Sequence, residues 1–414
     1  MGGEVQLSFV SYKKDSYIVV EGKQDADRFF IIQQGKAIIS REVALEEEQG
    51  KLLGPGDFFG VISTMSSHSH IETVKAATDV VLISVLQGQY GDLIQKNSQV
   101  AIKIIKQFSK RLRHLNEMLA GLTLRKTAEV DSPHLFNVAE YYFKHKLYKQ
   151  AFYSYSRYLK YCPNEEHSKS AKSQLAGLKN HVGDFKYEYE SNELNRIYDK
   201  NTMLFAEGEP GNELFIIQRG SVTITKIVDN KEVLLAVLKA GDILGEMALL
   251  EGKPRAASAV ALEDCEVLAV NKVNFEHMIQ SQPQLIAKIT TLLADRIWLI
   301  YKQLANTFLI NPLGRMYDAL LIQLEKNRVP LNSTSPYIFS FGQWELINMV
   351  GLPEKEGNVL IGKMLTDKKI LIKDKKIHAV SVSEIAKLAE YFRKKDKIEK
   401  TIQESRLRNA PLMT

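Results

Sequence analysis

Apolar residues between positions 284 and 308 recur at steps of three and four. The positions are Ile286, Ile289, Leu293, Ile297, Ile300, Leu304 and Phe308. This 11-residue pattern is close to the natural period of an α-helix, so it predicts a long, straight helix over residues 284–308. Such a stripe could pack on its own domain or on a second subunit. Because it is longer than one small domain can cover, we expect a homodimer through this helix.

A second amphipathic helix is predicted over residues 99–120. Its apolar face consists of Ile102, Ile105, Phe108, Leu112, Leu115 and Leu119, with lysines and arginines elsewhere on the helix. Both helices follow segments that read as short strands, with alternating Ile, Val and Phe and with glycines between them. Each helix is therefore expected to end a β-rich domain.

The two β-rich segments are copies of one another. FFIIQQG at 29–35 matches LFIIQRG at 214–220, and GDFFG at 56–60 matches GDILG at 241–245. Both pairs are separated by the same interval along the chain, which is the mark of an internal repeat. Short strands spaced closely around glycines favour a small antiparallel barrel or jelly roll. The sequence therefore predicts two jelly-roll (double-stranded β-helix) domains, at 1–125 and 190–308.

A helical insert is predicted between the copies, at 130–182. Its marker residues are Leu135, Val138, Ala139, Tyr142, Ala151, Tyr155, Tyr158 and Pro163, and their spacing resembles a single tetratricopeptide repeat. One such repeat cannot bury its apolar face alone. We expect it to pack on the terminal helix of the first domain rather than to form a peptide groove.

The C-terminal part alternates helices and strands. After an amphipathic helix, the pattern predicts a strand at 337–341, a helix at 342–350, a turn at Gly351 and a second helix at about 354–367. Two short strands then flank a charged turn at 373–376. This order is typical of a winged helix-turn-helix, here at 309–385. A charged tail at 386–414 follows, expected to fray or to form a solvated helix over 392–408. The fold class is therefore α+β multidomain.

The composition indicates the cellular compartment of the protein and shows which part of the chain carries its net charge. Two cysteines outside any CxxC pair exclude a cysteine-based zinc site and fit a reducing, cytoplasmic location. No apolar run is long enough to span a membrane. The net charge of +6 lies wholly in residues 310–414, which hold 18 Lys/Arg and 12 Asp/Glu. A basic C-terminal part on a neutral body favours a polyanionic partner, here double-stranded DNA, although it could be merely a solvated surface.

The stretch LGEMALLEGKPRAAS at 244–258 carries the candidate chemistry. Glu246 lies nine residues before Arg255, and small residues surround both. Backbone N–H groups of a Gly-Glu turn together with an arginine fork can bind a phosphate, while the carboxylate can accept a hydrogen bond from a sugar hydroxyl. The alternative is an ordinary surface loop.

This stretch, preceded by EGEPGNELFIIQRGSVTI, resembles the phosphate-binding cassette of cyclic-nucleotide-binding domains. The resemblance implies that Glu246 binds the ribose 2′-hydroxyl and Arg255 the cyclic phosphate. It also implies phosphate-binding amides near Gly245, Met247, Ala248 and Ala257, with Ser258 in the family's usual Ser/Thr position. Ala256 stands where cGMP-preferring relatives often carry a hydroxyl, which favours cAMP as effector. Trp298 and Tyr301, on the following helix, are candidates to cover the base. No metal is expected.

The first copy departs from the cassette at both key positions. Val61 stands in place of Glu246, and His70 in place of Arg255, while Glu72 would repel a phosphate. We therefore predict that this domain does not bind a cyclic nucleotide. His68 and His70, two residues apart and without further ligands, do not make a convincing metal site.

From about residue 198 to 382 the order of domains resembles Crp/Fnr-type (catabolite activator) transcription regulators, including the reading-head segment SFGQWELINMVGLPEKEGNVLIGKMLTDKKILI. That resemblance points to Glu354, Lys355, Asn358, Lys363, Lys373, Lys375 and Lys376 as DNA-binding residues. The second helix departs from the family pattern, because Glu354 and Glu356 stand where arginines are usual. Glutamate and asparagine can still read base edges, and the lysines can bind phosphates.

The leading hypothesis is a cAMP-responsive, dimeric transcription regulator in which the ligand repositions the helix at 284–308. The alternative is a cyclic-nucleotide receptor that signals through protein docking without sequence-specific DNA binding. The sequence contains no constellation typical of a nucleotide cyclase, phosphodiesterase or kinase, so we do not expect an enzyme.

Overall fold

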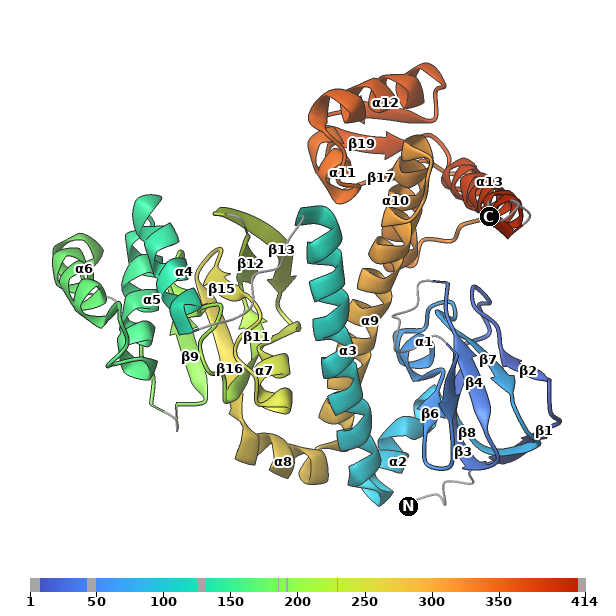
Figure 1. Cartoon of the computed structure of the whole chain (residues 1–414), viewed down its shortest axis with the longest axis horizontal. Coiled ribbons are helices and arrows are strands. Elements are labelled where there is room, and N and C mark those ends of the chain that lie inside the picture. Colours follow the sequence, from blue (N-terminus) through green and yellow to red (C-terminus); the bar gives the residue numbers. More distant parts are fainter. Residues whose placement is uncertain are drawn as a thin grey trace, which may run out of the picture.

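The computed structural model describes residues 8–42, 50–124, 132–184, 186–190, 193–228 and 230–408. Its first part is a β-roll of two four-stranded antiparallel sheets, ordered β1-β8-β3-β6 and β2-β7-β4-β5 (Figure 1). The strands are β1 Ser8–Tyr12, β2 Tyr17–Val19, β3 Arg28–Gln34, β4 Ala37–Ser40, β5 Lys51–Leu53, β6 Phe58–Phe59, β7 Thr73–Ala76 and β8 Val80–Leu86. The apolar core between the sheets includes Phe30, Ile32 and Leu82.

The second β-roll repeats this topology, with sheets β14-β11-β16-β9 and β10-β15-β12-β13. Its strands are β9 Asn195–Tyr198, β10 Met203–Phe205, β11 Glu213–Arg219, β12 Ser221–Val228, β13 Lys231–Lys239, β14 Ile243–Leu244, β15 Ser258–Ala261 and β16 Cys265–Asn271. The register is the same in both copies: Phe30 pairs with Ser84, and their counterparts Phe215 and Ala269 pair in the second copy. Two antiparallel β domains built from one repeat are therefore confirmed.

Each β-roll carries equivalent helices. The first has α1 Val61–Ser66, the 3₁₀ turn η1 Gln87–Gln89, α2 Tyr90–Lys96 and α3 Ser98–Leu124; the second has α7 Glu246–Glu251, α8 Lys272–Ser281 and α9 Pro283–Thr307. Both predicted long helices are present, as α3 and α9. They lie side by side in the centre of the molecule, with one β-roll on each side (Figure 1).

The predicted homodimer through residues 284–308 is not supported by the packing of α9. Ile286, Leu293 and Ile297 are fully buried within this chain, in one apolar cluster with Ile105 and Leu112 of α3. The stripe is indeed longer than one β-roll can cover. However, its partner is the equivalent helix of the same chain, so this face is not available to a second subunit.

The insert forms three helices, α4 Ser132–Lys144, α5 Tyr148–Tyr161 and α6 Ser168–Val182. The expectation that it packs on the first domain's terminal helix is wrong. Its aromatic core is continuous with Met203, Ala206 and Val260 of the second β-roll. The physical reason is that buried tyrosines need hydrogen-bond partners. Tyr153, for example, donates to the carbonyl oxygen of Leu204 at 3.0 Å.

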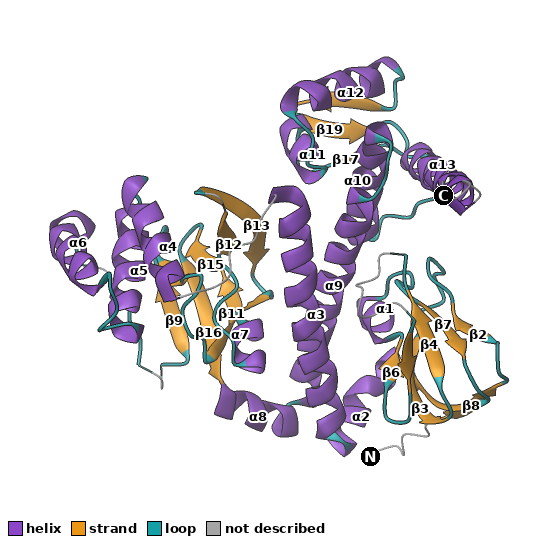
Figure 2. Ribbon diagram, viewed as in Figure 1, coloured by secondary structure: helices purple, strands orange, loops and turns teal. Residues whose placement is uncertain are grey.

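The C-terminal part contains the predicted elements close to the predicted bounds (Figure 2). They are α10 Pro312–Lys326, β17 Tyr337–Ile338, α11 Gln343–Met349, α12 Glu354–Thr366, β18 Ile370–Lys373, β19 Lys376–Ala379 and α13 Val382–Arg408. The three strands form one antiparallel sheet in the order β17-β19-β18. Gly351 joins α11 to α12 in the left-handed region, at φ +62°.

The expectation of a frayed or solvated tail over 392–408 holds only in part, because α13 starts at Val382 and packs on α10. Arg393 forms an ion pair with the buried Asp318, and the buried Asp396 accepts a hydrogen bond from the amide of Ile310 at 2.9 Å. Separately, none of the helices within the described ranges is long and apolar enough to cross a membrane.

Candidate functional site

The predicted cassette is one continuous turn from β14 through α7 to β15. Gly245 caps α7 in the left-handed region, at φ 78°. A side chain at this position would collide with the guanidinium of Arg255, so the close approach requires glycine. Glycine thus lets the arginine lie directly beneath the start of α7.

Glu246 is buried and ion-paired to α9. Its Oε1 accepts a hydrogen bond from Nη1 of Arg296 at 2.9 Å. The same nitrogen also donates to the carbonyl of Ile243, at 3.3 Å. A buried carboxylate needs such a partner, because an unpaired charge in the interior costs several kcal/mol. The predicted sugar-binding group is thereby linked to the long helix. Sequence reasoning did not identify Arg296.

Arg255 is 4% exposed and lies among aromatic rings. Its Nη1 donates to the carbonyl of Gly245 at 2.7 Å, and its guanidinium carbon lies 4.3 Å from the ring centre of Phe205. Its buried Nε makes no hydrogen bond to any described residue. Burial lowers the pKa of Arg255 from its usual value. A buried donor that lacks an acceptor is a physical reason to expect an anionic ligand here.

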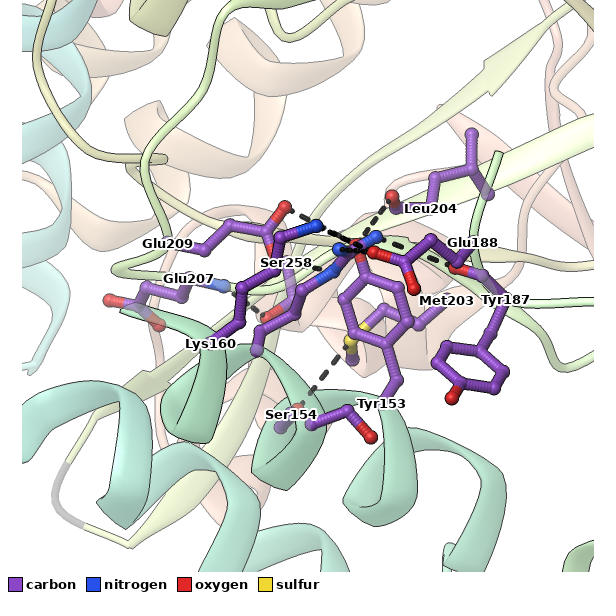
Figure 3. Close-up of polar contacts among 12 residues, drawn as sticks. Tyr153, Ser154, Lys160, Tyr187, Glu188, Met203, Leu204, Glu207, Glu209 and Ser258 are labelled. Carbon is purple, nitrogen blue, oxygen red and sulfur yellow. Dashed lines mark hydrogen bonds and ion pairs between the residues drawn. The ribbon is translucent and has the colours of Figure 1, made fainter. Parts of the chain in front are cut away.

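Glu209 stabilises the arginine from the other side, and sequence reasoning missed it. The amide of Arg255 donates to the carbonyl of Glu209 at 2.8 Å. The Glu209 carboxyl group is 5% exposed, and burial raises its pKa to about 7 although Arg157 and Arg255 oppose that shift. Figure 3 shows Tyr153 of the insert next to it, donating to Oε1 at 3.3 Å. The Glu207-Gly208-Glu209 turn was visible in the sequence, but nothing local indicated this contact.

The other predicted cassette residues are brought together as expected. Met247 and Ala248 lie in the first turn of α7, and Ala256 and Ala257 are half-buried before β15. Ser258 is fully buried, and its hydroxyl accepts a hydrogen bond from the amide of Glu207 at 2.9 Å. Ser258 therefore stabilises the turn that carries Glu209.

Trp298 and Tyr301, proposed to cover the base, face the other β-roll. Trp298 stacks on His68 at 4.0 Å and donates to the carbonyl of Ser69 at 3.2 Å. Together with Arg328 these residues line a cavity of about 780 Å³. Tyr301 donates to Glu21 at 2.8 Å. The expectation was wrong because the stripe of α9 bearing these residues turns toward the first domain.

The cassette of the first copy contains its own carboxylate. Glu72 is buried, and its Oε1 accepts a hydrogen bond from the amide of Gly60 at 2.6 Å. Its Oε2 lies 2.7 Å from Arg41 and 4.0 Å from Arg111. Burial alone would raise the pKa of Glu72, but the two arginines and the amide lower it below its usual value. Val61 and His70 are also buried, and His70 lies 3.4 Å from Asp25.

Comparisons with known proteins agree with this geometry. The cyclic nucleotide-binding domain family matches residues 9–97 and 195–282. The cAMP-activated global transcriptional regulator CRP of Salmonella typhimurium is 28% identical over 177 residues, which cover 42% of this chain and 83% of that protein. The chain contains two cyclic nucleotide-binding domains and is homologous to Crp/Fnr family regulators.

The chain also matches a second curated regulator and solved structures. The anaerobic regulatory protein of Bacillus subtilis is 32% identical, covering 32% of this chain and 56% of that protein. Among solved structures, a CRP/FNR family transcriptional regulator from Thermus thermophilus is 20% identical with a TM-score of 0.36. It covers 47% of this chain and 98% of that one.

Downstream of the second cyclic nucleotide-binding domain, all the predicted DNA-binding residues are exposed. Glu354, Lys355, Asn358 and Lys363 lie on α12, and Lys373, Lys375 and Lys376 lie on the β18–β19 hairpin. Asp374 and Lys375 form its tight turn, both at positive φ. Within the described residues, no group of three or more His, Cys, Asp or Glu is arranged to hold a metal ion.

Proposed function

We propose that the protein is a receptor for a cyclic nucleotide, preferentially cAMP, and acts as a Crp/Fnr-type DNA-binding transcription regulator. The observation that carries the proposal is the burial of two opposite charges, Glu246 and Arg255, within one short stretch of chain. Glu246 and Arg255 are both nearly inaccessible, and Arg255 retains a donor without a described acceptor. Glu246 would accept from the ribose 2′-hydroxyl, and Arg255 would bind the cyclic phosphate.

The remaining cassette residues would complete the site. Backbone amides of Gly245, Met247, Ala248 and Ala257 would surround the phosphate, with Ser258 stabilising the turn. Ala256 offers no hydroxyl for a guanine amino group, which supports the preference for cAMP over cGMP. No step in this proposal needs a metal.

The signal would travel along α9. Arg296 pairs with Glu246 in the cassette, so a ligand hydroxyl that engages Glu246 competes with this pair. Further along the helix, Asn306 donates to Asp318 at 2.8 Å and to the carbonyl of Arg315 at 2.9 Å, both in α10. One helix therefore contacts both the site and the C-terminal unit. A ligand can shift this helix only if it binds one position of the helix more tightly than another.

The helices and strands support a division of the chain into five parts. We propose a degenerate cyclic nucleotide-binding domain at 1–125, a tetratricopeptide-like insert at 130–182, the ligand-binding domain at 190–308 and a winged helix-turn-helix at 309–385, with a tail at 386–414. The exposed lysines of α12 and of the hairpin support DNA as the partner, since lysines on a wing bind backbone phosphates.

The second candidate function is a receptor that signals by docking to a protein. Its support is the surface of α11 and α12, where Trp344 is 63% and Val359 is 69% exposed beside the acidic Glu354 and Glu356. Exposed large apolar residues next to carboxylates are more usual on a protein-binding surface than on one that faces phosphates.

Calorimetric titration tests the ligand. The full chain should bind cAMP more tightly than cGMP, at one site per chain. Arg255→Ala should weaken cAMP binding by about 30-fold or more, because it removes a charge-assisted fork worth about 2–5 kcal/mol. Arg255→Lys keeps the positive charge but not the two-pronged guanidinium, so its affinity for cAMP should lie between those of the wild type and Arg255→Ala. Arg219→Ala, at an exposed arginine, is the matched control. Two sites per chain would contradict the assignment.

Genome-wide DNA capture with and without cAMP separates the two candidate functions. A regulator should retain defined sequences only when cAMP is present. The double variant Lys375→Ala, Lys376→Ala should then weaken binding to all sequences alike and lower the salt dependence by about one unit per lost phosphate contact. Failure to retain any sequence at moderate salt would favour protein docking.

A further inference from the structure

The two cyclic nucleotide-binding domains pack on each other in a reciprocal manner. Helix α3 of the first domain packs on α9 and also on α7, the cassette helix of the second domain. Helix α9 of the second domain likewise packs on α1, the cassette helix of the first (Figure 1). Contact of each copy's terminal helix with the other copy's cassette is the pattern of an isologous dimer interface.

Individual hydrogen bonds repeat this reciprocity. Trp298 of α9 donates to the carbonyl of Ser69 at 3.2 Å, and Arg113 of α3 donates to the carbonyl of Pro254 at 3.3 Å. The two donors are equivalent positions of the repeat, and so are the two acceptors, because the interval that relates the repeated segments also relates each pair. The chain thus contains, within one molecule, the interface of a two-fold dimer.

On the side of the second domain, α3 holds both ends of the segment that leads to Arg255. Arg113 Nε donates to Glu251 Oε2 at 2.9 Å, and Ser109 donates to Oε1 of the same carboxylate at 3.0 Å. Glu251 is the last residue of α7, and Pro254 immediately precedes Arg255. Arg113 and Glu251 are both about nine-tenths buried. The segment 251–254, which leads to Arg255, is therefore fixed to the first domain at each end.

On the other side, the first domain satisfies its cassette internally. The carboxylate of Glu72 already provides the Gly60 amide and Arg41 with anionic oxygens. A phosphate would have to displace it. The first domain therefore keeps its cassette in one conformation without an external ligand. Such a domain can serve as a rigid support for the cassette of the second domain.

We propose that the first domain is the in-chain partner of the second, and that Arg113 and Ser109 of α3 position the loop that presents Arg255 to the cyclic nucleotide. This inference rests on the proposed ligand function of the second domain. Arg113 is a positioning residue, because it acts through Glu251 and Pro254 and not on the nucleotide itself. One chain then provides a complete site without a second copy.

The test measures cAMP affinity by calorimetry in full-length variants, alongside the thermal unfolding midpoint. Arg113→Ala should weaken cAMP binding about tenfold or more. Arg113→Lys should restore part of the affinity, because an ammonium group can still reach Glu251. Lys110→Ala, on an exposed position of the same helix, is the matched control and should bind like the wild type.

A double-mutant cycle separates positioning from a general loss of folding. In the background Glu251→Gln, the further change Arg113→Ala should cost less affinity than it does in the wild type, because the charged pair is already lost and chiefly the bond to the Pro254 carbonyl remains to be removed. Equal losses in both backgrounds would overturn the proposal. So would wild-type affinity in Arg113→Ala. If the unchanged chain binds neither cAMP nor cGMP, the function proposed for the second domain fails first, and this inference fails with it.

Discussion

At the scale of single residues, one of the substitutions between the copies gives the first cassette a carboxylate of its own. Glu72 of the first domain occupies the position that Ala257 holds in the second copy of the repeat. The carboxylate of Glu72 lies where a bound anion would meet the Gly60 amide and two arginines. In the first domain a side chain of the protein thus supplies the anionic oxygens for these groups.

Replacing Glu72 by alanine should convert this arrangement into an anion site. We expect Glu72→Ala to lower the stability by about 3–5 kcal/mol in a buffer without polyvalent anions, because a buried ion pair loses one member. Phosphate should restore part of this loss, by mass action on the folded state. Thermal unfolding over a phosphate series measures the effect, with the wild type as control. A variant that unfolds at the same temperature at every phosphate concentration would contradict it.

The buried carboxyl of Glu209 predicts a pH dependence of stability. Its pKa is raised to about 7, so the folded protein binds a proton that the unfolded chain releases near its ordinary value of 4.5. The free energy of unfolding should therefore fall as the pH rises from about 4.5 to 7, by at most roughly 3–4 kcal/mol at about 1.4 kcal/mol per pKa unit.

Glu209→Gln should remove this pH-dependent loss, whereas Glu266→Gln, at a more exposed position, should retain it. Urea unfolding at pH 5 and pH 8 measures both. An equal decline with pH in the wild type and in Glu209→Gln would show that other groups are responsible.

At the scale of elements, two glycines in α12 have different roles. A methyl group on Gly357 would lie 2.6 Å from two carbons of Ile347 in α11, whereas nothing lies within 4 Å of one on Gly362. Alanine gains about 1 kcal/mol over glycine in a helix, but forcing extra volume into a packed contact typically costs about 1–3 kcal/mol. The tight crossing of the two helices therefore depends on Gly357 alone.

The same substitution at these two glycines should have opposite effects. From helix propensity alone, Gly362→Ala should stabilise the C-terminal unit by up to about 1 kcal/mol. The cost of overpacking exceeds this gain at the other position, so Gly357→Ala should destabilise the unit by roughly 1 kcal/mol or more. Chemical unfolding monitored through Trp344, on the neighbouring helix, distinguishes the two variants, and each serves as the control for the other. Stabilisation by both would mean that α11 and α12 do not pack this closely.

At the scale of the whole molecule, the burial of the α9 stripe predicts a monomer. Ile297 and Leu304 are fully buried within the chain. Sedimentation should therefore give the mass of one chain, with or without saturating cAMP. The variant Ile297→Asp, Leu304→Asp should unfold or separate the two domains, rather than reduce the mass. A wild-type dimer at micromolar concentration that this variant dissociates would contradict the prediction.

The packing of two cyclic nucleotide-binding domains within one chain also leads to an expectation for DNA recognition. A dimer of conventional regulators presents two reading heads to a palindrome, and the spacing of half-sites reflects its symmetry. In this chain the two cyclic nucleotide-binding domains share one described α11–α12 pair, which is the proposed reading head. If the proposed function is correct, captured DNA should contain single, non-palindromic sites.

The sequence by itself determined the repeat, the long helices, the order of the C-terminal elements and the place of the candidate cassette in the chain. These follow from local rules: the periods of strand and helix, the positions that require glycine, and a motif contained within one short stretch of chain. Gly245, Glu246 and Arg255 lie close in the chain, so the sequence shows them as one motif.

Only the tertiary structure decided which surfaces meet. Three hydrogen bonds around the site join residues that are 50 to 138 positions apart in the chain. They link Arg296 to Glu246, Arg113 to Glu251 and Tyr153 to Glu209. An apolar stripe specifies that it must be buried, but not against what, because the hydrophobic effect has no direction. For that reason α9 was correctly predicted as a helix and wrongly assigned to a second subunit. Its partner is the equivalent helix of the same chain.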